Sequence, residues 1–179
     1  MAIKTASGSG LTNSLSSGLV LLNTTSFSGA TSQSLSSSLD RTIYNQWRVI
    51  MQVYASTSTS LRLRARANTT DVSTGVYGAS FFADYLGTGK DIFSSSNNSA
   101  QATPSVLGGN ANNPSLIAFD IDLLADRAKM RIAGNAFSDD GAKSYFFGYS
   151  FDGTNINGFT ILPATGTMTG TVSLYGYNK

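Results

Sequence analysis

The chain has 179 residues, of which 12% are charged, and its net charge is +2. It contains neither cysteine nor histidine. Their absence excludes disulfides, thiolate metal sites and the histidine-based centres of most hydrolases. The weak charge balance argues against nucleic-acid binding, and no apolar run approaches the roughly 20 residues of a membrane helix. We expect one non-enzymatic domain that needs no cofactor and does not insert into membranes.

The first 18 residues are mostly Ser, Gly, Thr and Ala, with Ile3, Leu11 and Leu15 as isolated apolar side chains. Such a segment cannot form its own core. It is either a loose tail or an arm that becomes ordered along a neighbouring subunit. It lacks the apolar centre of a signal peptide, so we expect synthesis in a cytoplasm. Residues 1–18 are therefore assigned to a polar arm and residues 19–179 to a single domain.

The most regular pattern lies in residues 44–67, YNQWRVIMQVYASTSTSLRLRARA. Apolar side chains alternate with polar ones on both sides of a Ser/Thr segment, which predicts an antiparallel hairpin. The register that keeps both apolar rows on one face places Trp47 opposite Ala67. The same register places Arg48 nearly opposite Arg66.

The other face of this predicted hairpin carries four arginines. Like charges across a ladder are unfavourable, so we expect a carboxylate from another strand or subunit to lie near Arg62, Arg64 or Arg66. The alternative is that the arginine stems cover the sheet while their charged ends remain in water.

A second hairpin is predicted in residues 116–134, LIAFDIDLLADRAKMRIAG. Its expected register sets Asp120 opposite Arg131 and Asp122 opposite Lys129. These pairings favour a ladder of surface ion pairs over a calcium site.

The closing residues 157–177 predict a third hairpin. Pairing Leu162 with Thr167 places Phe159 opposite Gly170, a large side chain against the smallest residue.

Residues 19–25 are apolar on both faces, as expected for a strand that is covered on both sides or lies at a subunit contact. Further strands are expected at residues 34–39, at the edge of a sheet, and at residues 76–86 and 143–151.

Residues 87–113 are rich in Gly, Ser and Asn, and we interpret them as a long exposed loop. It is either a contact surface or a tolerated insertion. The candidate receptor-facing residues in or near it are Tyr85, Asn97, Asn98, Asn110, Asn112 and Asn113.

About ten strands and no helix predict an all-β fold, an antiparallel β-sandwich of the jelly-roll type with an extended N-terminal arm. An enzyme such as a polysaccharide depolymerase would need two carboxylates across a cleft. The spacing of the available carboxylates supports no such pair: Asp84, Asp91, Asp139, Asp140 and Asp152.

The segments GLVLLNTTSFSGATSQSL, YNQWRVIMQVYA, LRLRARA and GFTILPATGTMTGTVSLYGYNK resemble small β-sandwich domains of bacteriophage virion proteins, especially tail-fibre and tail-tip appendages. The resemblance covers most of residues 18–179. It implies a structural protein of the virion that forms a homo-oligomer, often a trimer, and contacts other virion proteins and a host surface glycan. Only about eighteen residues precede the predicted sandwich, so the arm would attach the protein to the particle. So short an arm also suits a capsid decoration (cement) protein. The expected interface residues are Ile3, Leu11, Leu15, Arg48, Arg62, Arg64 and Arg66.

Overall fold

The computed structural model describes residues 18–36, 38–84, 90–124, 129–138 and 143–178, with only the main chain of residues 45, 84, 90, 91 and 178. These ranges contain thirteen strands and no helix. The strands are β1 (Leu19–Ala30), β2 (Gln33–Leu35), β3 (Tyr44–Ala55), β4 (Thr59–Ala67), β5 (Thr70–Asp71), β6 (Val76–Asp84), β7 (Lys90–Ser99), β8 (Ala102–Leu107), β9 (Ser115–Leu123), β10 (Lys129–Ser138), β11 (Lys143–Asp152), β12 (Ile156–Pro163) and β13 (Met168–Asn178).

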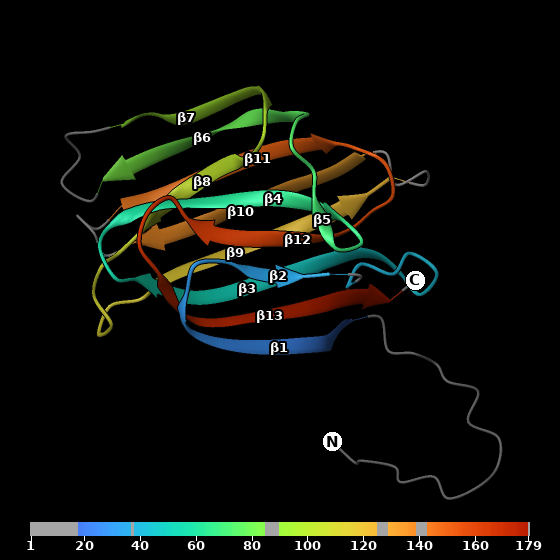
Figure 1. The fold of residues 1–179 in the computed structure, drawn as a ribbon, viewed down its shortest axis with the longest axis horizontal. Coiled ribbons are helices and arrows are strands. Elements are labelled where there is room, and N and C mark those ends of the chain that lie inside the picture. Colours follow the sequence, from blue (N-terminus) through green and yellow to red (C-terminus); the bar gives the residue numbers. More distant parts are fainter. Residues whose placement is uncertain (1–17, 37, 85–89, 125–128, 139–142, 179) are drawn as a thin grey trace, which may run out of the picture.

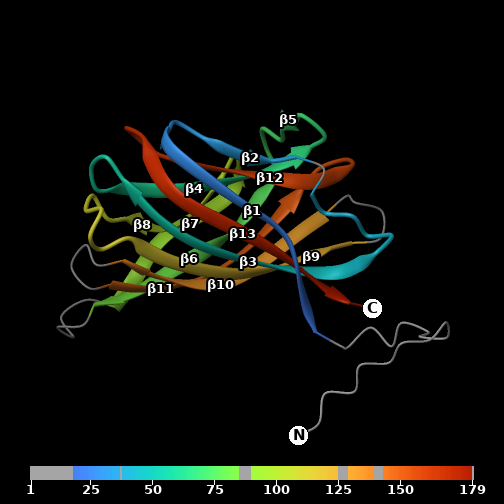
Figure 2. The same ribbon diagram turned by 90° about the horizontal axis from the view of Figure 1, so that it is seen from below.

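The strands form two antiparallel sheets that pack face to face (Figures 1 and 2). The large sheet has the order β1-β13-β3-β9-β10-β11-β6-β7. The small sheet has the order β2-β12-β4-β5, and β8 also pairs with β4. The predicted β-sandwich is confirmed. The more specific jelly roll is not confirmed, because that fold arranges eight strands as two Greek keys, whereas β9, β10 and β11 here are consecutive neighbours in one sheet.

A single core fills the space between the sheets. Alternate side chains of the long strands point into it, as the period of two requires. Trp47 of β3 is completely buried and lies between Gly176 of β13 and Ile121 of β9. Phe119 of β9 contacts Phe159 of β12 edge-to-face, with the ring centroids 5.9 Å apart. This contact joins the two sheets through their aromatic side chains.

The predicted hairpin in residues 44–67 is wrong, because its two strands lie in different sheets. β3 pairs with β13 and β9 in the large sheet, whereas β4 pairs with β12, β5 and β8 in the small sheet. Arg48 and Arg66 are therefore not cross-strand neighbours. Both strands bury the apolar row that the pattern predicted, but the rows face each other across the core instead of lying side by side.

The closing hairpin is wrong for the same reason. β12 belongs to the small sheet and β13 to the large one. Phe159 lies opposite Leu35 and Ala65, and the large partner of Gly170 is Phe27 of β1. The pairing of large with small thus occurs at Gly170, with a different aromatic residue from the expected one.

The hairpin of β9 and β10 is confirmed, but its register is shifted by two residues from the expected one. Arg131 lies opposite Asp122, and Asp120 lies opposite Ala133. A shift of two leaves every side chain on its predicted face, so the apolar pattern cannot distinguish the two registers. The predicted ion-pair ladder is replaced by pairs with other strands, since Lys129 pairs with Asp152 of β11 at 3.1 Å.

Residues 87–113 are not one long loop, because β7 and β8 lie within them. β7 is the edge strand of the large sheet, next to β6. Its serines replace the apolar row that would have revealed a strand. The hydroxyl groups of Ser80, Ser94 and Tyr149 all donate to the Thr103 carbonyl oxygen, at 2.9, 2.7 and 2.9 Å. This hydroxyl cluster connects the large sheet to β8.

Removing the hydroxyl group of Tyr149 tests the hydroxyl cluster. The ring is buried, and its hydroxyl also lies 2.8 Å from Ser94 Oγ. Tyr149→Phe should lower the free energy of unfolding by about 1 kcal/mol, the usual net value of such a hydrogen bond, as measured by denaturant titration. Tyr77→Phe is the matched control, since Tyr77 is 40% exposed on the same sheet. An equal loss in both variants would contradict a specific contribution of the cluster.

Two other strand predictions are confirmed at the sheet edges. β2 is the edge strand of the small sheet, as expected, but it spans only Gln33–Leu35 in place of the predicted residues 34–39. β1 is an edge strand of the large sheet, and its first residues are exposed. The first alternative for residues 19–25, a strand covered on both sides, is therefore wrong within the chain itself.

Candidate interaction surfaces

The arginines of β4 lie on the outer face of the small sheet. Arg66 Nη1 donates to Asp71 Oδ1 at 2.6 Å and to Thr160 Oγ1 at 3.0 Å. Nη1 also contacts Ser34 Oγ, at 3.1 Å, while Nε donates to Ser36 and Nη2 to the Thr69 carbonyl. Only 13% of the Arg66 side chain is exposed. Arg66 of β4 therefore links β2, β5 and β12 through hydrogen bonds, and its guanidinium is not available to another protein.

Arg64 joins the same network. Its guanidinium lies 3.6 Å from Asp71 and donates to Gln101 at 3.0 Å. Arg62, opposite Leu162, makes no ion pair within the described residues. The prediction that one of these arginines meets a carboxylate from another strand is confirmed. Asp71 was missed, although its place just after an Asn-Thr-Thr turn indicates a strand that folds back onto β4.

Arg48 lies on the other sheet, far from this network in the topology. Its Nη1 is 3.3 Å from both carboxylate oxygens of Asp120, which also accepts a hydrogen bond from Tyr177 Oη at 3.1 Å. The Tyr177 hydroxyl raises the pKa of Arg48 most, burial opposes this effect, and Asp120 raises the pKa further. The guanidinium is therefore charged in any physiological buffer. Because both partners are well exposed, the pair adds little to stability.

The outer face of the large sheet is the side turned away from the small sheet. In an antiparallel sheet, residues directly opposite each other share a face, so the register arranges the outward side chains in rows across the strands. Three of these rows differ clearly in their chemical character. The apolar row contains Ile50, Ala118, Asn135, Phe146, Phe81 and Ile92. The floor row contains Arg48, Asp120, Ala133, Gly148 and Ala79. The polar row contains Gln46, Asp122, Arg131, Ser150 and Tyr77.

The apolar row exposes large side chains that a monomeric surface normally avoids. Phe146 is 58% exposed, Phe81 52% and Ile92 56%. Leu116 and Phe137 lie beside this row and are also about half exposed. The sequence contains a signal for this surface: Tyr145, Phe146 and Phe147 are consecutive in a strand, so one of the three must point outward.

Two depressions hollow the outer face. One has a volume of about 320 Å³ and lies among Ile50, Leu116, Phe137 and Phe146. The other, of about 640 Å³, extends over the floor and polar rows from Tyr177 to Ser150. The first is apolar, whereas the second combines carboxylates, a guanidinium, an amide and hydroxyl groups.

The candidate receptor-facing residues do not form one surface. Asn97 and Asn98 are exposed on β7, and Asn98 Oδ1 accepts from the Gly75 backbone amide at 3.1 Å. Asn110, Asn112 and Asn113 lie in the turn between β8 and β9, where the Asn110 side chain accepts from the Asn112 amide at 2.9 Å. That turn borders β3 and β13, at the opposite side of the sheet order from β7.

The remaining predicted positions fall outside the described residues: Ile3, Leu11, Leu15, Tyr85, Asp139 and Asp140. Of the carboxylates considered for catalysis, Asp152 is described with its side chain, and it is paired with Lys129.

No group of three or more acidic, histidine or cysteine side chains in the described ranges could hold a metal ion. Those ranges also contain no helix long and apolar enough to cross a membrane. No protein-family model and no curated protein matches the sequence.

Proposed function

We propose that this chain is a non-enzymatic structural protein of a bacteriophage virion, a tail-fibre or tail-tip appendage that assembles as a homotrimer. The sequence resemblance suggests the class, and a sequence without histidine or cysteine suits a role in assembly. The observation that carries the proposal is the uncovered apolar edge of the large sheet at β1.

The start of β1 exposes apolar side chains that a second chain would cover. Leu19, Val20 and Leu21 are 45%, 37% and 54% exposed, so apolar side chains emerge on both faces of one strand. Edge strands are normally protected by charge, proline or a covering loop. The twelve residues of β1 contain neither a charge nor a proline. A second copy of the chain is the proposed partner, because a closed ring of copies would cover every such edge.

Polar substitution at this edge tests the proposal. The double variant Leu19→Ser and Leu21→Ser should shift the molar mass in light scattering from that of a trimer to that of a monomer. The variant should also fail to enter particles when it replaces the native protein during phage growth. Ile92→Ser is the matched control, because Ile92 is 56% exposed on the opposite edge strand β7. A monomeric native protein, or a double variant of unchanged mass, would contradict the proposal.

Copy number separates the appendage from the alternative, a decoration protein of the head. Quantitative gel analysis of purified particles should give the low copy number of an appendage. A copy number near that of the major head protein would instead place the chain on the head lattice.

A further inference from the structure

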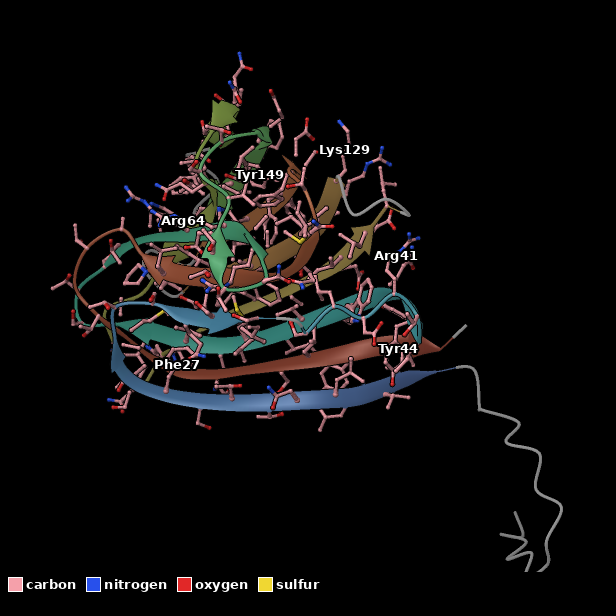
Figure 3. All side chains as sticks on the ribbon, turned by 45° about the vertical axis from the view of Figure 1, so that its right-hand side comes forward. Phe27, Arg41, Tyr44, Arg64, Lys129 and Tyr149 are labelled. Atoms are coloured by element: carbon pink, nitrogen blue, oxygen red, sulfur yellow. The ribbon has the colours of Figure 1, made fainter. Side chains whose placement is uncertain are left out.

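β1 ends the large sheet on one side and exposes two leucines on the outer face of that sheet. It is the blue strand at the lower rim of Figure 3, and no described strand pairs with its far side. Leu19 and Leu21 lie opposite tyrosines of β13 that belong to the outer face, with no bulge between them. The two leucine side chains therefore share the outer face and stand about 7 Å apart. We call this pair the leucine edge.

The apolar depression of the same face can receive such a projection. Its described lining contains no charged residue, and its exposed apolar side chains are those of Ile50, Leu116, Phe137 and Phe146. Its volume is about 320 Å³. Truncation of one buried leucine leaves a cavity on the order of 150 Å³, so the depression has room for about two leucine side chains.

The charged depression of the outer face is a poorer receptor for leucines. Its lining contains Asp120, Asp122 and Arg131, and apolar side chains placed over these groups would remove their hydration without replacing it. The leucine edge belongs to a strand without charge. Burial of this edge in the apolar depression therefore desolvates no ionised side chain on either surface.

A chain cannot place its leucine edge in its own apolar depression. Asn135, which lines the depression, lies on β10. β10 is four strand spacings from β1, about 19 Å across the sheet. The edge and the depression also belong to one face of one sheet, so both point the same way. Only another copy can bring a leucine edge to this depression.

We propose that the leucine edge of one copy packs into the apolar depression of the next. The edge and the depression are different surfaces, so the contact is heterologous. Three copies related by a threefold rotation close a ring in which every edge and every depression is covered. The three large sheets then form a triangle, with the edge of each against the outer face of the next. Pairing of two β1 strands with each other would instead give a dimer and leave both depressions exposed.

This inference rests on the proposed homotrimer, and it names the surface that receives β1. A heterologous contact can close a ring with other numbers of copies. The contact and the trimer can therefore fail separately.

Cross-linking between two introduced cysteines tests the contact, because the chain has no cysteine of its own. The full-length double variant Val20→Cys and Asn135→Cys keeps both leucines and every apolar residue of the depression. A short bismaleimide would join the thiols, since it spans gaps that a disulfide cannot. Val20→Cys with Ser150→Cys is the matched control, because Ser150 lines the charged depression of the same face. Within one chain, either pair is separated by at least about 19 Å across the sheet, beyond the reach of the reagent.

The Asn135 pair should link up to three chains on a denaturing gel, whereas the Ser150 pair should remain a single chain. Leu116→Ser should lower the molar mass in light scattering from that of a trimer to that of a monomer, because Leu116 is 53% exposed in the depression. Ile92→Ser, outside the depression, should leave the mass unchanged. Equal circular dichroism spectra would show that the variants are folded.

The proposal is overturned if the Ser150 pair links as readily as the Asn135 pair, or if neither pair links in a trimeric protein. A trimeric Leu116→Ser also overturns it; if that trimer fails to enter particles, the depression receives another virion protein. Cross-linked rings of two or four chains would uphold the contact and contradict the trimer. A monomeric native protein that neither pair cross-links would contradict both proposals.

Discussion

Phe119→Ala should lower the free energy of unfolding by about 3 to 5 kcal/mol. Phe119 is 2% exposed and packs edge-to-face against Phe147 of its own sheet, at 6.1 Å, and against Phe159 of the other, at 5.9 Å. Its removal leaves a cavity at the contact between the sheets, where the surrounding strands cannot easily collapse. Denaturant titration would measure the loss, and the melting temperature should fall by roughly 10 °C.

Phe146→Ala is the matched control for this substitution. It removes the same side chain from the same sheet, but Phe146 is 58% exposed on the outer face. The expected loss is within about 1 kcal/mol, the range of strand propensity. Similar losses in the two variants would mean that Phe146 contributes as much packing energy on the outer face as Phe119 does in the core.

Asp71→Ala should cost about 2 to 3 kcal/mol, because it leaves a nearly buried guanidinium without its carboxylate. Asp71 Oδ1 accepts from Arg66 at 2.6 Å and from Thr160 at 2.7 Å. Thr160 is 2% exposed, and its Oγ1 also accepts from Arg66 Nη1 at 3.0 Å. Denaturant titration would report the change, with Asp122→Ala as the control on a carboxylate for which no ion pair is formed within the described residues.

A double-mutant cycle separates the penalty of the orphaned charge from the value of the network. Replacing both Arg66 and Asp71 with apolar residues of similar size should recover much of the loss, since no unpaired charge remains. If the double variant is as unstable as the sum of the single ones, the network itself supplies the stability. In either case, Arg66 acts within the fold, in contrast to its predicted role at an interface.

The outer face of the large sheet and the apolar edge at β1 meet at β13. Leu19 and Leu21 lie opposite Tyr177 and Tyr175, which continue the polar and floor rows. Assembly through the edge would therefore place Tyr175 and Tyr177 on the outer face of each copy beside a subunit contact.

The strands and their buried faces could be predicted from the sequence alone. In β3, β4 and β9 the alternation of apolar residues identified the side chains that reach the core, and all of these except Ala67 are buried. This information is local, because successive side chains of an extended backbone point to opposite sides wherever the strand lies. The all-β sandwich follows from the number of such strands and the lack of helical periodicity.

The partners of each strand were decided only by the tertiary structure. β3 and β4 have the same pattern whether they pair in one sheet or face each other across a core, and a shift of two residues in the β9–β10 hairpin leaves both faces unchanged. The polar strand β7 has no apolar row and gave no signal. The rows of the outer face exist because residues far apart in the chain, such as Ala133, Gly148 and Ala79, are brought into register by pairings that depend on the whole sheet. Alternation is a property of neighbouring residues, whereas pairing is settled by the competition among distant strands to bury their apolar faces together.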